Sequence, residues 1–194
     1  MIKLPYINNS LRFITGLALI LTAPTIALAT QYNTVVPDES NVQFVYTQMG
    51  VSMEGSFKEF EGEIEFDTDN PESASASFQV SLSSVDTGTT DGDEEVVKDE
   101  WFAVNNHPFA SFTSEKVAVG SNNSYEVEGV LNIKGQEKSI VIPVQLSESE
   151  NKAVFEGEFN INRGDFAIGE GSWSSFDIVA NEVTVKVKIT ATSN

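Results

Sequence analysis

Apolar and polar residues alternate along most of this chain, in segments about as long as a β-strand. From Ala74 to Leu82, apolar residues occupy every second position, and serine or glutamine fills the positions between them. The same alternation recurs over residues 125–133, 140–146, 155–161 and 183–189. Because successive side chains of a strand point to opposite faces, each segment has one apolar and one polar face. The pattern predicts strands folded around a shared apolar interior, as a sandwich or a closed barrel.

Turn-forming sequences separate these segments, and one acidic segment interrupts them. A lead-in from Thr30 to Ser40 precedes strands near residues 42–47 and 56–66, and later strands begin near residues 73 and 109. In the acidic segment, Val97 and Trp101 lie four positions apart and would share one helix face. We therefore predict an all-β fold, an antiparallel barrel of about eight strands with a short helical insertion near residues 91–104.

The first 29 residues have the pattern of an export signal. Lys3 and Arg12 give a positive start, residues 13–21 are apolar, and Ala27-Leu28-Ala29 offers small residues for cleavage before Thr30. The apolar run is shorter than the roughly 20 residues that a membrane-spanning helix needs. We therefore expect a signal peptide over residues 1–29, a periplasmic location, and one folded domain over residues 30–194, which is long enough to bury a core.

Charge and cysteine content narrow the partners of this domain. Residues 1–29 hold two of the 11 basic residues and none of the 29 acidic ones, so the remainder carries a formal charge of −20. Such a surface repels nucleic acid and anionic lipid heads, and its simplest explanation is solubility. The chain has no cysteine, which excludes disulfides and a cysteine-linked lipid anchor.

The sequence lacks the residues of a catalytic or metal site. Without cysteine and with a single histidine, thiol catalysis and multi-histidine metal sites are excluded. His107 directly precedes Pro108, which is typical of a turn residue. The acids of residues 91–100 lack the ligand spacing of a calcium loop, and Gly169-Glu170-Gly171 lacks the strand-to-helix context of a phosphate loop. We expect no catalytic residue, metal or cofactor, and a binding protein rather than an enzyme.

The aromatic residues suggest what the barrel encloses. The chain has 13 phenylalanines, two tryptophans and four tyrosines, which would either fill the interior or line a cavity. A barrel of about eight strands has room for one small ligand if it is not filled. From strand parity, the expected wall residues are Phe44, Phe78, Leu131, Ile133, Phe155, Phe159 and Val185. Expected at the mouth or lid are Met53, Trp101, Phe102, Phe109, Phe166 and Trp173.

Short blocks in a fixed order carry a resemblance to a known family. They are Gly55 to Gly62, Phe66-Asp67, Asn70-Pro71, Ser84 to Thr87, Trp101-Phe102, His107 to Phe112, Val127 to Gly135 and Ile161 to Gly169. With these blocks the chain resembles the YceI family of exported, lipocalin-like, polyisoprenoid-binding proteins. The glycines inside the strands would permit the bends of a barrel. Arg163 and Asp165, on either side of a glycine, could pair across its rim.

The resemblance implies a lipid-binding function. It indicates a periplasmic protein that sequesters or carries a polyisoprenoid or an isoprenoid quinone. Residues 169–173 resemble a subgroup associated with membrane b-type cytochromes, which makes a quinone a reasonable guest. The chain has Gln48-Met49-Gly50 where many members have histidine-leucine-glycine, so no role of that histidine transfers. The alternatives are a packed module that docks to such a cytochrome and an enzyme acting on an isoprenoid, and the oligomeric state stays open, with a homodimer among the choices.

Overall fold

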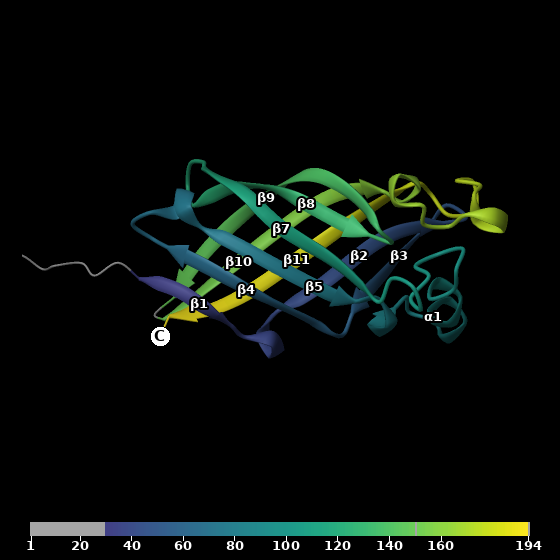
Figure 1. Cartoon of the computed structure of the whole chain (residues 1–194), viewed down its shortest axis with the longest axis horizontal. Coiled ribbons are helices and arrows are strands. Elements are labelled where there is room, and N and C mark those ends of the chain that lie inside the picture. Colours follow the sequence, from purple (N-terminus) through teal and green to yellow (C-terminus); the bar gives the residue numbers. More distant parts are fainter. Residues whose placement is uncertain (1–29, 150, 194) are drawn as a thin grey trace, which may run out of the picture.

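In the described part of the chain, all strands join one antiparallel sheet that closes into a barrel. The computed structural model describes residues 30–149 and 151–193, so the expected signal peptide lies outside the described residues. The sheet order is β1-β4-β5-β7-β8-β9-β10-β11-β2-β3-β6, and an additional β1–β11 pairing closes it. Figure 1 shows the barrel lengthwise, with α1 and the long loops at one end and the C-terminus at the other.

The barrel is built from short strands in the first half of the chain and long strands in the second half. The first half contains β1 (Gln31–Val35), β2 (Asn41–Gln48), β3 (Val51–Phe57), β4 (Phe60–Asp67), β5 (Ser75–Ser81), β6 (Val85–Asp86) and α1 (Thr90–Val96). The second half contains β7 (Phe109–Val119), β8 (Ser124–Ile133), β9 (Gln136–Ser149), β10 (Lys152–Asn162) and β11 (Glu182–Ser193).

Three pairs of short strands each occupy one position of the barrel wall. The first half of β11 pairs with β2 and its last residues pair with β1. In the same way, β3 pairs with β2 whereas β4 pairs with β1. A short 3-10 helix at Pro37–Glu39 separates β1 from β2, and another at Leu82–Ser84 separates β5 from β6. The wall therefore has eight positions, and the predicted eight-stranded barrel with one short helix is confirmed.

Two details of the predicted elements were wrong. The expected lead-in contains β1. The residues around Tyr32 are polar and show no alternation, although the Tyr32 side chain is buried in the interior. The expected helix over residues 91–104 ends at Val96 and is followed by turns. A longer helix would have placed Asp99 and Glu100 at its negative C-terminal end. The turns instead let both Trp101 and Phe102 face the barrel interior.

The end of the barrel far from α1, here called the closed end, is filled by side chains. Its core cluster consists of Tyr32, Ile64, Phe66, Leu146, Ala153, Phe155, Ile189 and Ala191. Phe66 makes edge-to-face contacts with Tyr125 and Phe155, with ring centroids 5.5 and 5.2 Å apart. The closed end therefore supplies a packed apolar core beneath the rest of the barrel.

Candidate functional site

The other end, here called the mouth end, encloses a cavity with two lobes. The upper lobe, toward α1, has a volume of about 490 Å³, and the lower lobe, toward the closed end, has about 180 Å³. Both lobes touch the same six residues: Val42, Val80, Ala110, Leu131, Phe159 and Val185. The two lobes therefore adjoin and form one elongated space along the barrel.

Strand β11 runs along this space and shows where it ends. Val183 lines the upper lobe, Val185 lines both, and Val187 and Ile189 line the lower lobe. At about 3.3 Å per residue, these side chains span about 20 Å along the strand. The three valines are only partly buried although they face inward, whereas Ile189 is buried. The interior is thus hollow at the mouth end and becomes filled at the closed end.

Aromatic rings lie against the wall because glycines face them across the strands. Phe44 of β2 is opposite Gly55 of β3, and Phe78 of β5 is opposite Gly62 of β4. A Cβ atom at either glycine would overlap the ring of its partner. Each glycine therefore lets a large ring lie flat on the sheet, and this function differs from the bending role expected from the sequence. The arrangement keeps aromatic surface in the wall and leaves the centre open.

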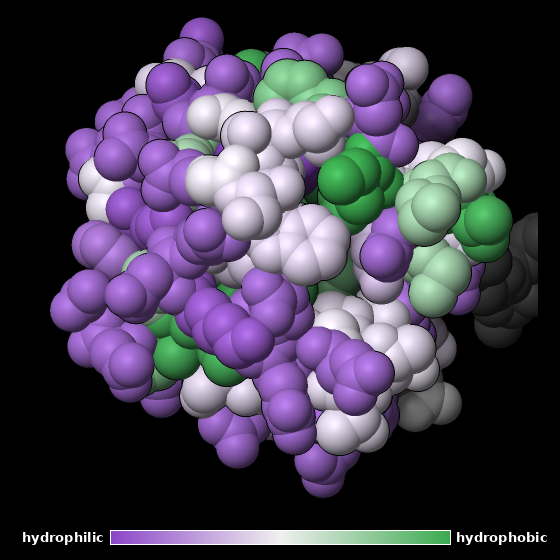
Figure 2. All heavy atoms as spheres, turned by 90° about the vertical axis from the view of Figure 1, so that its right-hand side faces the viewer, coloured by the Kyte–Doolittle hydropathy of each residue, from purple (hydrophilic) through white to green (hydrophobic). Residues whose placement is uncertain are grey.

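The cavity opens beside the beginning of α1. Of the residues that line the upper lobe, Thr89 and Asp91 are exposed on the molecular surface. Figure 2 views this end of the molecule, where hydrophilic residues cover most of the surface and apolar residues gather near the middle and to one side. Among the exposed apolar residues at this end are Met49 and Ile178, whose loops join through a 2.7 Å bond from the Met49 N–H to the Ile178 carbonyl.

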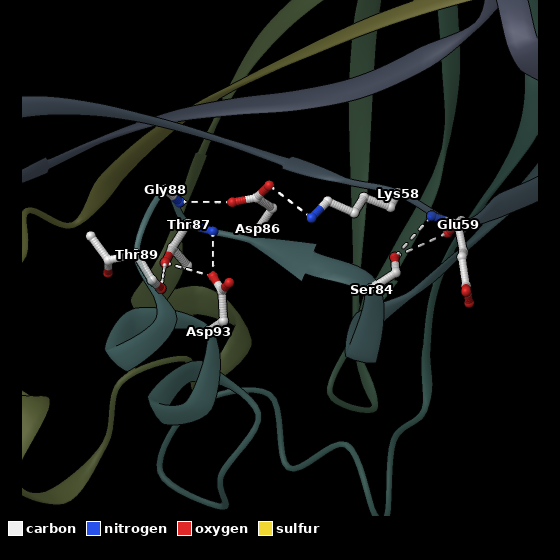
Figure 3. A network of polar contacts seen from close by, with 8 residues as sticks. All are labelled: Lys58, Glu59, Ser84, Asp86, Thr87, Gly88, Thr89 and Asp93. Atoms are coloured by element: carbon white, nitrogen blue, oxygen red, sulfur yellow. Dashed lines mark hydrogen bonds and ion pairs between the residues drawn. The ribbon is translucent and has the colours of Figure 1, made fainter.

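Polar contacts hold α1 beside this opening (Figure 3). The Thr89 side chain caps the helix by accepting from the Gly92 N–H at 3.2 Å. Asp93 Oδ1 accepts from the backbone N–H and the hydroxyl of Thr87, at 2.6 and 2.8 Å. Beside them, Asp86 forms a 2.9 Å ion pair with Lys58, and this contact lowers the pKa of the Asp86 carboxyl. These bonds fix the acidic first turn of α1 at the cavity entrance.

A buried arginine organises the loop on the opposite side of the mouth. Arg163 is only 2% exposed and lines the upper lobe. Its guanidinium donates to six backbone carbonyls, at 2.7–3.3 Å: those of Ile168, Gly169, Trp173, Ser175, Val179 and Ala180. Burial lowers the pKa of Arg163. The expected rim pair with Asp165 does not form, because the loop carbonyls draw the arginine inward; Asp165 accepts from the Asn162 amide at 3.4 Å.

Further bonds tie this loop to the α1 segment. Lys134 Nζ donates to the Asp99 carbonyl at 2.9 Å and to the Ala167 carbonyl at 2.8 Å. Trp173 Nε1 donates to Glu95 Oε1 at 2.9 Å, and its ring lies 5.5 Å from that of Trp101, centroid to centroid. Hydrogen bonds therefore join the α1 segment, the turn at Lys134 and the loop after Arg163 into one frame around the upper lobe.

The structure brings most of the predicted site residues to the cavity. The upper lobe is lined by Phe44, Met53, Trp101, Phe102, Ile133 and Trp173, the lower lobe by Phe78 and Phe155, and both lobes by Leu131, Phe159 and Val185. The remaining two lie elsewhere. Phe109 is the first residue of β7 and is 49% exposed, whereas Phe166 is 1% exposed and packs behind the lining in a cluster with Trp101 and Ile168. The residues assigned to the wall from strand parity all line the cavity, whereas position along a loop does not tell which way a side chain turns.

Sequence reasoning missed several polar lining residues. Gln48, Thr87, Thr89, Asp91 and Glu95 line the upper lobe. The acids of α1 were interpreted as a solvated face, and no periodic signal distinguishes the two that reach the cavity. The single histidine, His107, lies against the Gly135 turn. Among the described residues, no cluster of three or more metal-ligand side chains and no helix suited to crossing a membrane is found.

Comparison with known proteins finds relatives that match this chain over most of their length. The UPF0312 protein of Yersinia enterocolitica is 30% identical over 171 residues, which cover 83% of this chain and 87% of the relative. That of Ectopseudomonas mendocina is 30% identical over 134 residues, or 66% of this chain and 70% of the relative.

Two solved structures share the barrel. Burkholderia cenocepacia BcnA superposes with a TM-score of 0.79 at 34% identity, over 81% of this chain and 99% of that one. A polyisoprenoid binding domain from Saccharophagus degradans superposes with a TM-score of 0.63 over 86% and 100%, and at 17% identity this likeness concerns the fold alone. The YceI-like domain family matches residues 33–191, which span nearly the whole barrel, and the chain therefore belongs to that family.

Proposed function

We propose that this protein is exported and carries a long isoprenoid lipid inside its barrel. The observation that carries the proposal is the elongated, mainly apolar cavity, whose two lobes adjoin along about 20 Å of β11. A volume of about 490 Å³ for the upper lobe alone lies within the range of small-molecule sites. The Saccharophagus degradans neighbour, a polyisoprenoid binding domain of the same fold, supports an isoprenoid as the guest.

The mechanism is sequestration. An apolar chain that enters the cavity leaves water, which contributes roughly 25 cal/mol for each Å² of buried apolar surface, less the cost of ordering the chain. The wall rings at Phe44 and Phe78 are already held flat against their glycine partners, so the space is largely formed before the ligand enters. The resemblance of residues 169–173 supports a quinone as the guest and a membrane b-type cytochrome as a partner.

The alternative of a packed docking module requires a filled interior. The lobes of about 490 and 180 Å³ argue against it, since a filled barrel would leave no such volumes. We therefore retain lipid carriage as the proposal.

Native mass spectrometry of the protein purified gently from its own host, with organic extraction, tests this function. The expected result is one bound isoprenoid lipid per chain. Phe159→Glu places a charge between the lobes and is expected to abolish retention while the barrel stays folded. Val119→Glu, which adds the same charge at an exposed strand position, is the matched control and should retain the lipid. An unliganded mass that stays unchanged after incubation with quinones and polyprenols would refute the proposal.

A further inference from the structure

The two lobes of the cavity differ in polarity, which orients a ligand. The lower lobe is lined by apolar side chains and glycine, apart from Ser111. The upper lobe adds polar side chains, namely Tyr46, Gln48, Thr87, Thr89, Asp91, Glu95 and Arg163. A lipid with a long tail and a polar head would therefore place its tail in the lower lobe and its head beside α1, because burial of a polar head among apolar groups is costly.

The charges around the head position are mainly negative. Asp91 and Glu95 line the upper lobe, and Asp93 lies between them in the sequence of the same short helix. Glu95 accepts from Lys98 and from the Trp173 indole, and the Lys98 contact above all lowers the pKa of its carboxyl, so Glu95 stays ionised at neutral pH. An anionic head would therefore meet fixed carboxylates at the entrance and inside it.

The cation in the lining has no N–H group left for a ligand. Arg163 is the one cationic side chain among the described residues that line the upper lobe. Its five N–H donors face six backbone carbonyls: Nε faces those of Val179 and Ala180, Nη1 those of Ile168 and Gly169, and Nη2 those of Trp173, Ser175 and Val179. A phosphate could bind this guanidinium only by breaking the bonds that hold the loop.

Nearby lysines are occupied as well. Lys98 pairs with Glu95, and Lys58 pairs with Asp86. Lys134, whose side chain is largely buried, bonds two backbone carbonyls and Glu170. The uncharged groups at Gln48 and Thr89, in contrast, can hydrogen-bond a carbonyl or hydroxyl oxygen without a charge being buried.

From this arrangement we infer that the cavity selects lipids with an uncharged, oxygen-bearing head, such as a quinone or a free polyprenol, over their phosphorylated counterparts. The inference rests on the lipid-carrying function proposed above. It assigns selectivity to the carboxylates of Asp91 and Glu95 and to the saturation of Arg163 by backbone carbonyls. A phosphorylated lipid has the same tail, so the tail-binding lower lobe does not distinguish the two classes.

Geranylgeraniol and geranylgeranyl monophosphate, whose extended tails match the cavity's length of about 20 Å, form the matched ligand pair for the test. Each is titrated in the same detergent at neutral pH against the purified, delipidated protein, and the bound fraction is measured by native mass spectrometry. The expected affinity for geranylgeraniol is about tenfold higher or more, because the monophosphate brings its charge close to two carboxylates. In the double variant Asp91→Asn/Glu95→Gln, the monophosphate should gain affinity and the preference should shrink.

The control variant Glu126→Gln/Glu128→Gln removes the same charge from exposed positions on the outside of β8 and should keep the preference. Equal binding of the two ligands, or tighter binding of the monophosphate, would overturn the inference and leave lipid carriage standing. If neither ligand binds, and quinones do not bind either, the proposed function fails and the inference fails with it.

Discussion

The two ends of this barrel are stabilised in different ways. At the closed end, Tyr32, Leu146, Ala153 and Ala191 are almost wholly buried in one apolar cluster. At the mouth end, a second buried cluster around Phe166 packs behind the lining, and inward-facing residues such as Phe159 and Val183 remain partly exposed to the cavity. The frame there is also held by polar contacts from Arg163 and its neighbours. We infer that the packed end supplies more of the folding stability, whereas the polar frame keeps space for a ligand.

The comparison also concerns where a change can be tolerated. A packed cluster loses free energy whenever a side chain is shortened, because the neighbours cannot fill the gap. A side chain in the cavity wall has no packed neighbours on the side that faces the cavity. Shortening such a side chain therefore changes the shape of the site more than the stability of the fold. The polar frame behaves differently again, since removing one donor leaves several acceptors unpaired.

Loss of the buried arginine is expected to have the largest effect. Arg163→Met would leave six buried or partly buried backbone carbonyls without their donor, and we expect a loss of about 3–5 kcal/mol in the free energy of unfolding. Denaturant unfolding measures the loss, and hydrogen exchange should locate the lost protection in residues 164–180. Arg163→Lys keeps the charge but has fewer donors, so it should recover only part of the stability. A methionine variant as stable as the parent would show that the frame does not depend on Arg163.

Two phenylalanines on the same strand provide a matched test of the two ends. Phe155 belongs to the buried cluster at the floor of the lower lobe, whereas Phe159, four residues later on β10, is partly buried and lines both lobes. Phe155→Ala should cost about 3–5 kcal/mol of unfolding free energy, as expected for a packed core. Phe159→Ala should cost less than about half of that and should mainly weaken lipid retention. Equal losses in denaturant unfolding would contradict the contrast between a packed and a hollow end.

Acid should weaken the α1 side of the mouth by a smaller amount. The ordinary pKa values are 3.8 for Asp86 and 4.5 for Glu95, and their lysine partners lower both in the folded protein. Because the folded-state pKa values lie below the unfolded ones, these carboxyls stabilise the fold at neutral pH, and this stabilisation is lost as the pH falls below about 4.

The double variant Lys58→Gln/Lys98→Gln removes the two partners and provides the comparison. It should be slightly less stable than the parent at neutral pH. Its unfolding midpoint should fall less steeply between about pH 5 and about pH 3, the range in which the two carboxyls become protonated. The measurement is the denaturant midpoint as a function of pH. Identical profiles for the two proteins would show that these ion pairs contribute nothing to stability.

The strand pattern predicted the barrel because alternation is a local property. Phe44, Phe78, Phe159 and Val185 lie on strands whose other face is polar, so their inward direction follows from period-two geometry. The short strand β1 was missed because Tyr32 is its one inward residue with a strong signal. Phe109 and Phe166 were assigned to the mouth, but a residue at a strand end or in a loop has no fixed side-chain direction.

Alternation alone therefore predicts an all-β fold, its apolar interior and which strand residues face that interior. Only the tertiary structure shows that the interior is hollow, because the filled volume depends on cross-strand partners such as Gly55 beneath Phe44, which lie on different strands. The burial of Arg163 is likewise invisible in the sequence. Its six acceptors are backbone carbonyls, which every residue possesses, and only the folded loop brings them to one guanidinium.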